Sequence, residues 1–265
     1  YNDDYRLYDV VLDANNVAAY GFYMNSNQAK NVGAFYNCRF TNATNSGIFM
    51  GGYNGNSLYN CEADNNTNYG FRVEGAGRGA SNWYNCSFHD NGSGVWMVND
   101  TNFFSCKIYN NTNYGFHGVD RYAYTNTIHN CSIYGNGSHG LYINNSSELS
   151  PAANLITNNI FIGNGGYGIK TNATLSINYM SYGNLFSQNT SGPYDFTGVS
   201  YEAYPNQEII APADFDLSTG QFNYSSNTTN SRIPWGGAIG SVSRESFSTT
   251  ISGSLSLGTG GVGDI

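Results

Sequence analysis

The chain has 265 residues and a formal net charge of −8 at pH 7, from 10 Lys and Arg against 18 Asp and Glu. Charged residues make up 11% of the sequence, against about 25% in an average soluble domain, while 40% of the residues are hydrophobic, which suffices for a core and argues against wholesale disorder. The acidic balance argues against a nucleic-acid partner bound through its phosphates, and apolar runs of only a few residues exclude membrane insertion through a spanning helix.

An internal repeat of about 23 residues organises the chain. It is marked by five cysteines, which lie 23, 25, 20 and 25 residues apart: Cys38, Cys61, Cys86, Cys106 and Cys131. Each is followed two positions later by an apolar or small residue, and eight or nine positions later by Gly and an apolar residue. Asn159 and Asn184 continue the pattern without Cys, and Leu12 begins it, which makes eight copies.

The repeat predicts an all-β solenoid. Apolar and polar residues alternate after each Gly, as in Phe71-Arg72-Val73, which is the period of a strand. The stretch from Cys to Gly barely changes in length, whereas the return from Gly to the next Cys varies from 12 to 19 residues. Rigid corners beside variable loops are typical of stacked coils. We therefore expect a right-handed parallel β-helix of about eight rungs, with three short strands per rung, over residues 1–196.

Asparagines recur at two further positions of the repeat. One set precedes the cysteine position, as Asn37, Asn60, Asn85, Asn130 and Asn158, and the other follows it by five residues, as Asn66, Asn91, Asn111, Asn136, Asn164 and Asn189. Asn tolerates left-handed corners, and stacked amides can bond from rung to rung. We expect both sets to be structural.

The unit from Asn130 to Leu141, Asn-Cys-Ser-Ile-Tyr-Gly-Asn followed by Gly-Leu, resembles the repeat of right-handed parallel β-helix proteins. That superfamily includes pectate-lyase-like lyases and hydrolases, mannuronan epimerases and phage tailspikes, and the resemblance covers roughly residues 7–196. It implies the fold. Because this fold hosts many activities, the function has to be argued from particular residues.

The five cysteines all fall on one inward column. Parallel neighbours about 4.8 Å apart are slightly too distant for a relaxed disulfide, so we expect free, buried thiols. No Cys or His pair has the spacing of a zinc site, so we predict no metal and no cofactor, except Ca²⁺ if the protein is a lyase.

The strand after each Gly presents one outward side chain per rung. These form a predicted stripe of aromatic and charged residues: Tyr23, Phe49, Arg72, Trp96, His117, Tyr142, Lys170 and Asp195. Aromatic rings in a row suit the apolar faces of sugars, so we predict carbohydrate binding at Tyr23 through Lys170. Packing inside the protein or trimer contacts is the alternative. A second stripe, whose direction depends on the corner at the Asn, contains Tyr36, Tyr59, Tyr84, Phe104, His129 and Tyr182.

Three adjacent rungs carry acids just past the stripe, and these make a candidate catalytic set. Glu74, Asp100 and Asp120, with His117 beside them, could supply a general acid because like charges raise a carboxyl pKa. Paired carboxylates would suit glycoside hydrolysis. Arg72, Arg121 or Lys107 beside acid-bound Ca²⁺ would suit a lyase.

The repeat ends near Phe196. We expect residues 197–242 to cap the exposed strand edges, and 243–265 to form a Ser- and Gly-rich tail or connection. The segment around Asp214-Phe215-Asp216 and Gln221-Phe222 resembles the terminal cap of many bacterial β-helix repeat proteins.

The favoured hypothesis is an extracellular, cell-surface or virion β-helix, such as a tailspike or a secreted surface protein, whose partner is a polysaccharide or cell-surface glycan. The first alternative is a polysaccharide lyase or glycoside hydrolase. The second is a structural subunit of a fibre or sheath, with the aromatic stripes as homotrimer or fibre contacts.

Overall fold

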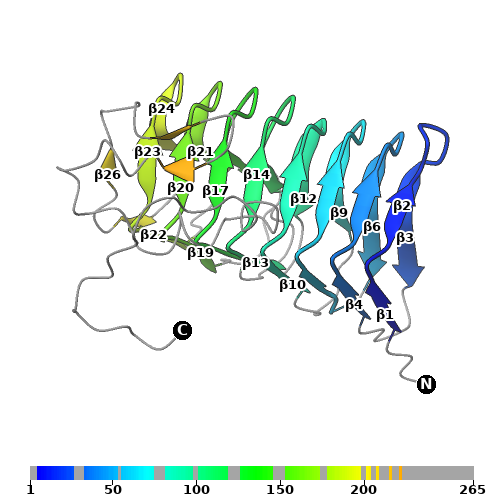
Figure 1. Ribbon diagram of the computed structural model, residues 1–265. Coiled ribbons are helices and arrows are strands. Elements are labelled where there is room, and N and C mark those ends of the chain that lie inside the picture. The colour runs from blue at the N-terminus through cyan, green and yellow to red at the C-terminus, as the bar shows by residue number, and fades with distance from the viewer. Residues whose placement is uncertain are drawn as a thin grey trace, which may run out of the picture.

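The structure of the protein is a computed structural model. It describes residues 5–26, 33–52, 55–74, 81–97, 101–118, 126–145, 153–173 and 178–197, and the short strands at 201–203, 207–208, 215–216 and 221–222. Three parallel sheets run along one axis, and the turns stack in chain order (Figure 1). No helix long and apolar enough to cross a membrane is found among the described residues.

One strand from each sheet makes a turn of the coil. Sheet A consists of β1 (Tyr5–Tyr8), β4 (Gly33–Tyr36), β7 (Ser57–Tyr59), β10 (Ser81–Tyr84), β13 (Thr101–Phe104), β16 (Asn126–His129), β19 (Ala153–Thr157), β22 (Asn178–Tyr182) and β25 (Tyr201–Ala203). Sheet B consists of β2 (Val11–Asp13), β5 (Arg39–Thr41), β8 (Glu62–Asp64), β11 (Ser87–His89), β14 (Lys107–Tyr109), β17 (Ser132–Tyr134), β20 (Ile160–Ile162), β23 (Leu185–Ser187) and β26 (Gln207–Glu208). Sheet C consists of β3 (Tyr20–Ser26), β6 (Ser46–Gly52), β9 (Tyr69–Glu74), β12 (Ser93–Met97), β15 (Phe116–Gly118), β18 (Leu141–Asn145), β21 (Tyr167–Ala173) and β24 (Gly192–Thr197).

The predicted parallel β-helix with three strands per rung is therefore confirmed. Sheets A and B have nine strands and sheet C has eight, so eight complete turns are followed by two strands of a ninth. In the first turn the predicted alignment is wrong by two residues. Leu12 pairs with Phe40, which places Val10 rather than Leu12 at the cysteine position.

Strand pairing continues beyond the boundary expected at residue 196. β25 stacks on β22 and β26 stacks on β23, so the coil reaches Glu208. β27 (Phe215–Asp216) and β28 (Gln221–Phe222) form an antiparallel pair within the segment that resembles a cap. The rest of 197–242, and the whole of 243–265, lie outside the described residues, so the cap and the tail stay predictions.

The core is the interior of the coil, filled by the inward-facing side chains of all three sheets. Phe40, Phe88 and Ile108 come from sheet B, and Phe71 and Phe116 come from sheet C. The five cysteines are free and buried, as predicted. Burial raises the pKa of the Cys86 and Cys131 thiols well above the ordinary value, because a thiolate is poorly solvated there.

The two asparagine sets have different structural roles. Asn37, Asn60, Asn85, Asn130 and Asn158, together with Ser105, adopt φ between 53° and 56°, which turns the chain from sheet A into sheet B. The left-handed residues of the next corner stand four positions after the cysteine, at Asn42, Asn65, Asp90 and Asn110. A short polar side chain tolerates this conformation better than an apolar one does.

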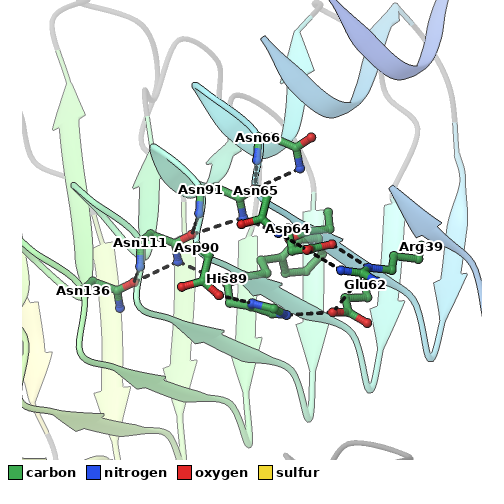
Figure 2. A network of polar contacts seen from close by, with 12 residues as sticks. Arg39, Glu62, Asp64, Asn65, Asn66, His89, Asp90, Asn91, Asn111 and Asn136 are labelled. Atoms are coloured by element: carbon green, nitrogen blue, oxygen red, sulfur yellow. Dashed lines mark hydrogen bonds and ion pairs between the residues drawn. The ribbon is translucent and has the colours of Figure 1, made fainter. Parts of the chain in front are cut away.

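The second asparagine set forms a buried amide ladder (Figure 2). Asn111 shows the pattern. Its Oδ1 accepts the backbone N–H of Asn91 at 3.1 Å and the Asn91 side-chain amide at 3.2 Å. Its Nδ2 donates to Phe88 O at 3.1 Å and to Asn136 Oδ1 at 2.9 Å. The same bonds recur from Asn66 to Asn189, so the turns along this stretch are tied to one another in one register.

The repeated glycine lies against this ladder. A Cβ on Gly115 would come within 2.5 Å of Gly140 O, 2.9 Å of Ile133 Cγ2 and 3.0 Å of Asn136 Nδ2. The glycine is therefore required by a close approach between turns, and its recurrence in the sequence reports that contact.

The ladder yields a test of stability. Asn111→Ala leaves buried donors and acceptors on Asn91, Phe88 and Asn136 without their partner, so we expect unfolding to become easier by about 3 kcal/mol. Urea denaturation followed by circular dichroism measures this. Asn113→Ala replaces an exposed asparagine of the same turn and should change stability by less than about 0.5 kcal/mol. Equal losses in the two variants would contradict the ladder's role.

Candidate functional site

The predicted stripe forms one column on the outer face of sheet C. Tyr23 pairs with Phe49, Phe49 with Arg72, and Arg72 with Trp96. The column then continues through His117, Tyr142, Lys170 and Asp195. The expected register is thus confirmed over eight turns. Whether the column binds sugar remains a prediction.

A second outward column, missed in the sequence, lies beside the first. It contains the residue before each repeated glycine and, in the last turn, the residue before Pro193: Tyr20, Ser46, Tyr69, Ser93, Tyr114, His139, Tyr167 and Gly192. Four of these residues are tyrosines and one is a histidine, so the outer face of sheet C is two aromatic columns wide. The signal was present as a recurring Tyr-Gly pair, but the inward or outward direction of the residue before the glycine depends on the corner.

At the N-terminal end of this face, rings from both columns pack together. Tyr23 and Phe49 stack with centroids 5.1 Å apart and planes 11° apart, and Tyr20 packs on Phe49 at 5.2 Å. Tyr23 is 53% exposed, whereas Phe49 is only 7% exposed. The expectation that Phe49 is an exposed contact residue is therefore wrong, because its neighbours cover it. Tyr23 offers the accessible ring here.

The centre of the face has rings at mixed angles. Trp96 meets Tyr69 at 5.3 Å and His117 at 4.5 Å, with planes 63° and 74° apart. Tyr114 lies between His117, at 4.8 Å, and Tyr142, at 5.0 Å. Burial lowers the pKa of His117 to about 4, because the imidazolium would lose its hydration among these rings. His117 is therefore neutral at physiological pH.

On the described strands of this face, each cation is paired with an acid and lies over aromatic rings. Arg72 contacts the Glu74 carboxylate, and its guanidinium lies 5.7 Å from the centroids of both Phe49 and Tyr69. Four turns further along, Lys170 Nζ lies 3.6 Å from Asp195 Oδ2 and 5.4 Å from the Tyr167 ring. The guanidinium and the ammonium group therefore contact the aromatic surface as well as their carboxylate partners.

The candidate catalytic set is only partly described. Glu74 is the last residue of β9, and its carboxylate pairs with the Arg72 guanidinium. His117 lies among the aromatic rings of sheet C. Asp100, Asp120 and Arg121 lie outside the described residues, so their distance from Glu74 stays untested. Lys107 lies on sheet B rather than sheet C, and is buried, which lowers the pKa of its amine.

The second predicted stripe faces outward on sheet A. Tyr8, Tyr36, Tyr59, Tyr84 and Phe104 stack in that order, with ring centroids 4.7 to 5.2 Å apart and planes 5° to 12° apart. His129 follows them in the same column, and the backbone of Tyr182 lies further along it. Each inner ring has a neighbour on both faces, so this ladder presents ring edges to solvent.

Sheet B carries a charged network on its outer face (Figure 2). Arg39 donates to both oxygens of Asp64, at 2.8 and 2.6 Å, and Asp64 is 1% exposed. His89 lies between Glu62, at 2.9 Å, and Asp90, at 2.7 Å. Burial opposes protonation of His89, but the two carboxylates outweigh it and raise its pKa. The network links three turns of the coil, and its charged groups form ion pairs with one another.

Arg39 and Glu62 stand one position after a cysteine, Asp64 and His89 three positions after one, and Asp90 four positions after Cys86. These offsets were the signal for the network in the sequence. Among the described residues, no group of three or more His, Cys, Asp and Glu side chains is arranged to hold a metal ion.

His117 and His89 yield opposite pH dependences of stability. Unfolded His117 gains a proton near pH 6.5, but folded His117 gains it only near pH 4. The contribution of His117 to stability therefore falls as the pH drops through this window, and His117→Gln should remove this contribution to the pH dependence. The pKa of His89 is raised, so its contribution is present below about pH 6.5 and is lost as the pH rises through the folded pKa. His89→Gln should lose more stability at about pH 5 than at about pH 8.

Urea midpoints of the wild type and both variants across this pH range measure these slopes. Parallel curves for the wild type and His117→Gln would show that the imidazole is solvated rather than buried among the rings.

Comparison with known proteins agrees with this architecture. A family model described as a right-handed β-helix region matches residues 8–121. A solved structure of a variant of the periplasmic alginate epimerase AlgG is similar with a TM-score of 0.53 and 18% identity, over 68% of this chain and 51% of that chain. Another structure of this epimerase gives a TM-score of 0.48 at 18% identity, over 69% of this chain and 51% of that chain.

No curated protein matches the sequence. The chain spans about half the length of the solved structures, and at this identity the likeness shows the fold. The stacked parallel sheets and the family match agree that this chain is a right-handed parallel β-helix protein.

Proposed function

We propose that the protein binds a polysaccharide chain along the outer face of sheet C, with the polymer running parallel to the coil axis. The observation that carries the proposal is the aromatic surface formed by two columns of that sheet, which extends from Tyr20 to Tyr167. Seven steps between neighbouring strands separate Tyr23 from Asp195, which amounts to roughly 34 Å at about 4.8 Å per step. This length suits an extended polymer.

Ring orientation favours sheet C over sheet A as the sugar platform. A pyranose ring places its apolar C–H face on an aromatic face, so the aromatic face has to be accessible. The rings of the sheet A ladder, such as Tyr59, cover one another's faces. On sheet C the planes of Tyr69, Trp96 and His117 differ by 63° and 74°, which leaves their faces turned in several directions.

Polar groups suited to sugar hydroxyls lie next to the rings. The Asn172 amide donates to the Tyr142 hydroxyl at 3.1 Å, and Asn144 occupies the same column as Asn172 one turn earlier. Such amides and phenols both donate and accept hydrogen bonds, as sugar hydroxyls do. Aromatic bodies with polar neighbours make a surface that is complementary to a glycan.

The similar solved structure is an alginate epimerase of the periplasm, which supports a polysaccharide as the class of ligand and does not specify its sugars. We place the protein outside the cytoplasm on the same support, at a cell surface or on a virion, where a long glycan is accessible.

The proposal is tested by affinity electrophoresis in gels that contain single polysaccharides. Trp96→Ala and Tyr142→Ala should each weaken retention about tenfold, because each removes a ring worth roughly 1.4 kcal/mol of contact. Tyr59→Ala is the matched control, since it removes a partly exposed tyrosine from sheet A, and it should leave retention unchanged.

Loss of retention in Tyr59→Ala alone would move the site to sheet A. Failure of the wild type to bind any polysaccharide would overturn the proposal and favour the fibre or sheath subunit. The same samples are analysed for shortened chains. Shortening that disappears in Glu74→Gln would establish the depolymerase instead.

A further inference from the structure

The outer face of sheet C is electrically balanced. Its described strands carry two cations, Arg72 and Lys170, and two acids, Glu74 and Asp195. Each cation lies beside one of the acids, so both pairs are neutral within the width of one or two strands. A ligand lying along the face meets no surplus of positive charge on these strands.

The histidines of the face add no charge near neutral pH. The pKa of His117 lies near 4 because of burial. Burial also lowers the pKa of His139, and the nearby Lys170 ammonium lowers it further, although Asp195 acts in the opposite direction. Both rings are therefore neutral at pH 7, where they serve as aromatic surface and hydrogen-bonding groups.

The charge of the whole chain also disfavours a polyanionic ligand. The chain as a whole has a net charge of −8. A polyanion approaching such a protein is repelled at long range, whereas proteins that hold carboxylates or sulfates use an excess of Arg and Lys.

From this balance we infer that the polysaccharide bound along sheet C is uncharged, a polymer of neutral sugars rather than of uronic acids or sulfated sugars. The inference rests on the proposed function and specifies its ligand class. Recognition then depends on ring contacts and on hydrogen bonds from amides such as Asn172, with the ion pairs fixing the positions of the surrounding rings.

The test compares polymers that differ in charge. Galactomannan, a neutral β-glucan and fully methyl-esterified polygalacturonan form the neutral set, and alginate and unesterified polygalacturonate form the anionic set. Dissociation constants are measured in about 20 mM and about 500 mM NaCl, which changes the Debye length several-fold. We expect a neutral polymer to bind with less than about a twofold change between the two salt concentrations.

A double variant supplies the second measurement. Glu74→Gln with Asp195→Asn removes both acids and leaves Arg72 and Lys170 uncompensated, so the face gains a charge of about +2. This variant should acquire retention of polygalacturonate that disappears at high salt, whereas the wild type should show none.

The outcomes separate the inference from the proposed function. Tight, salt-sensitive binding of alginate or polygalacturonate by the wild type, abolished by Trp96→Ala, would overturn the uncharged ligand and leave the binding face intact. Wild-type binding of neither set would overturn both. Neutral-polymer binding that survives Trp96→Ala and Tyr142→Ala would place the site away from sheet C and overturn both as well.

Discussion

The amide ladder from Asn66 to Asn189 is the interaction on which the rest of the molecule depends. A parallel β-helix has no hairpins to set its register, and consecutive strands of one sheet are separated by a whole turn of chain. The ladder fixes the register through contacts between neighbouring turns. Each asparagine binds the backbone of the neighbouring turn and the next amide in the same buried row, so a slip would leave several polar groups unpaired at once. The glycine that packs beside it leaves no room for a different path.

A fixed register makes the outer faces independent of one another. Sheet A presents a stacked tyrosine ladder, sheet B a network of charges, and sheet C an aromatic surface with paired ions. All three chemistries rest on the same interior of phenylalanine, isoleucine and cysteine. Outward side chains contribute little to the path of the chain, which is why one coil can hold surfaces as different as these.

Inward features could be predicted from the sequence because the core constrains them in every turn. Cys, the apolar residue two positions later and the Gly recur with almost constant spacing, and from them the fold and the column from Tyr23 to Asp195 follow. The direction of Tyr36 and the column of Tyr20 could not be predicted, because both flank corners whose bend is set by backbone dihedrals. The structure places the left-handed residue immediately after Tyr36, at Asn37, which turns that tyrosine outward. The burial of Phe49 could not be predicted for another reason, since it depends on neighbours from other turns. The Arg39 network could not be predicted because its contacts between turns join residues 23 to 27 positions apart, which meet only once the turns are aligned.

The recurrence of the same contacts between turns has an evolutionary consequence. Because each turn pairs with its neighbours through the same three strand positions, a genetic duplication or deletion that spans one whole repeat joins similar interfaces and leaves the pairing of the remaining turns in place. The length of the sheet C face can therefore change in evolution in steps of one turn, while the residues of the other turns stay the same.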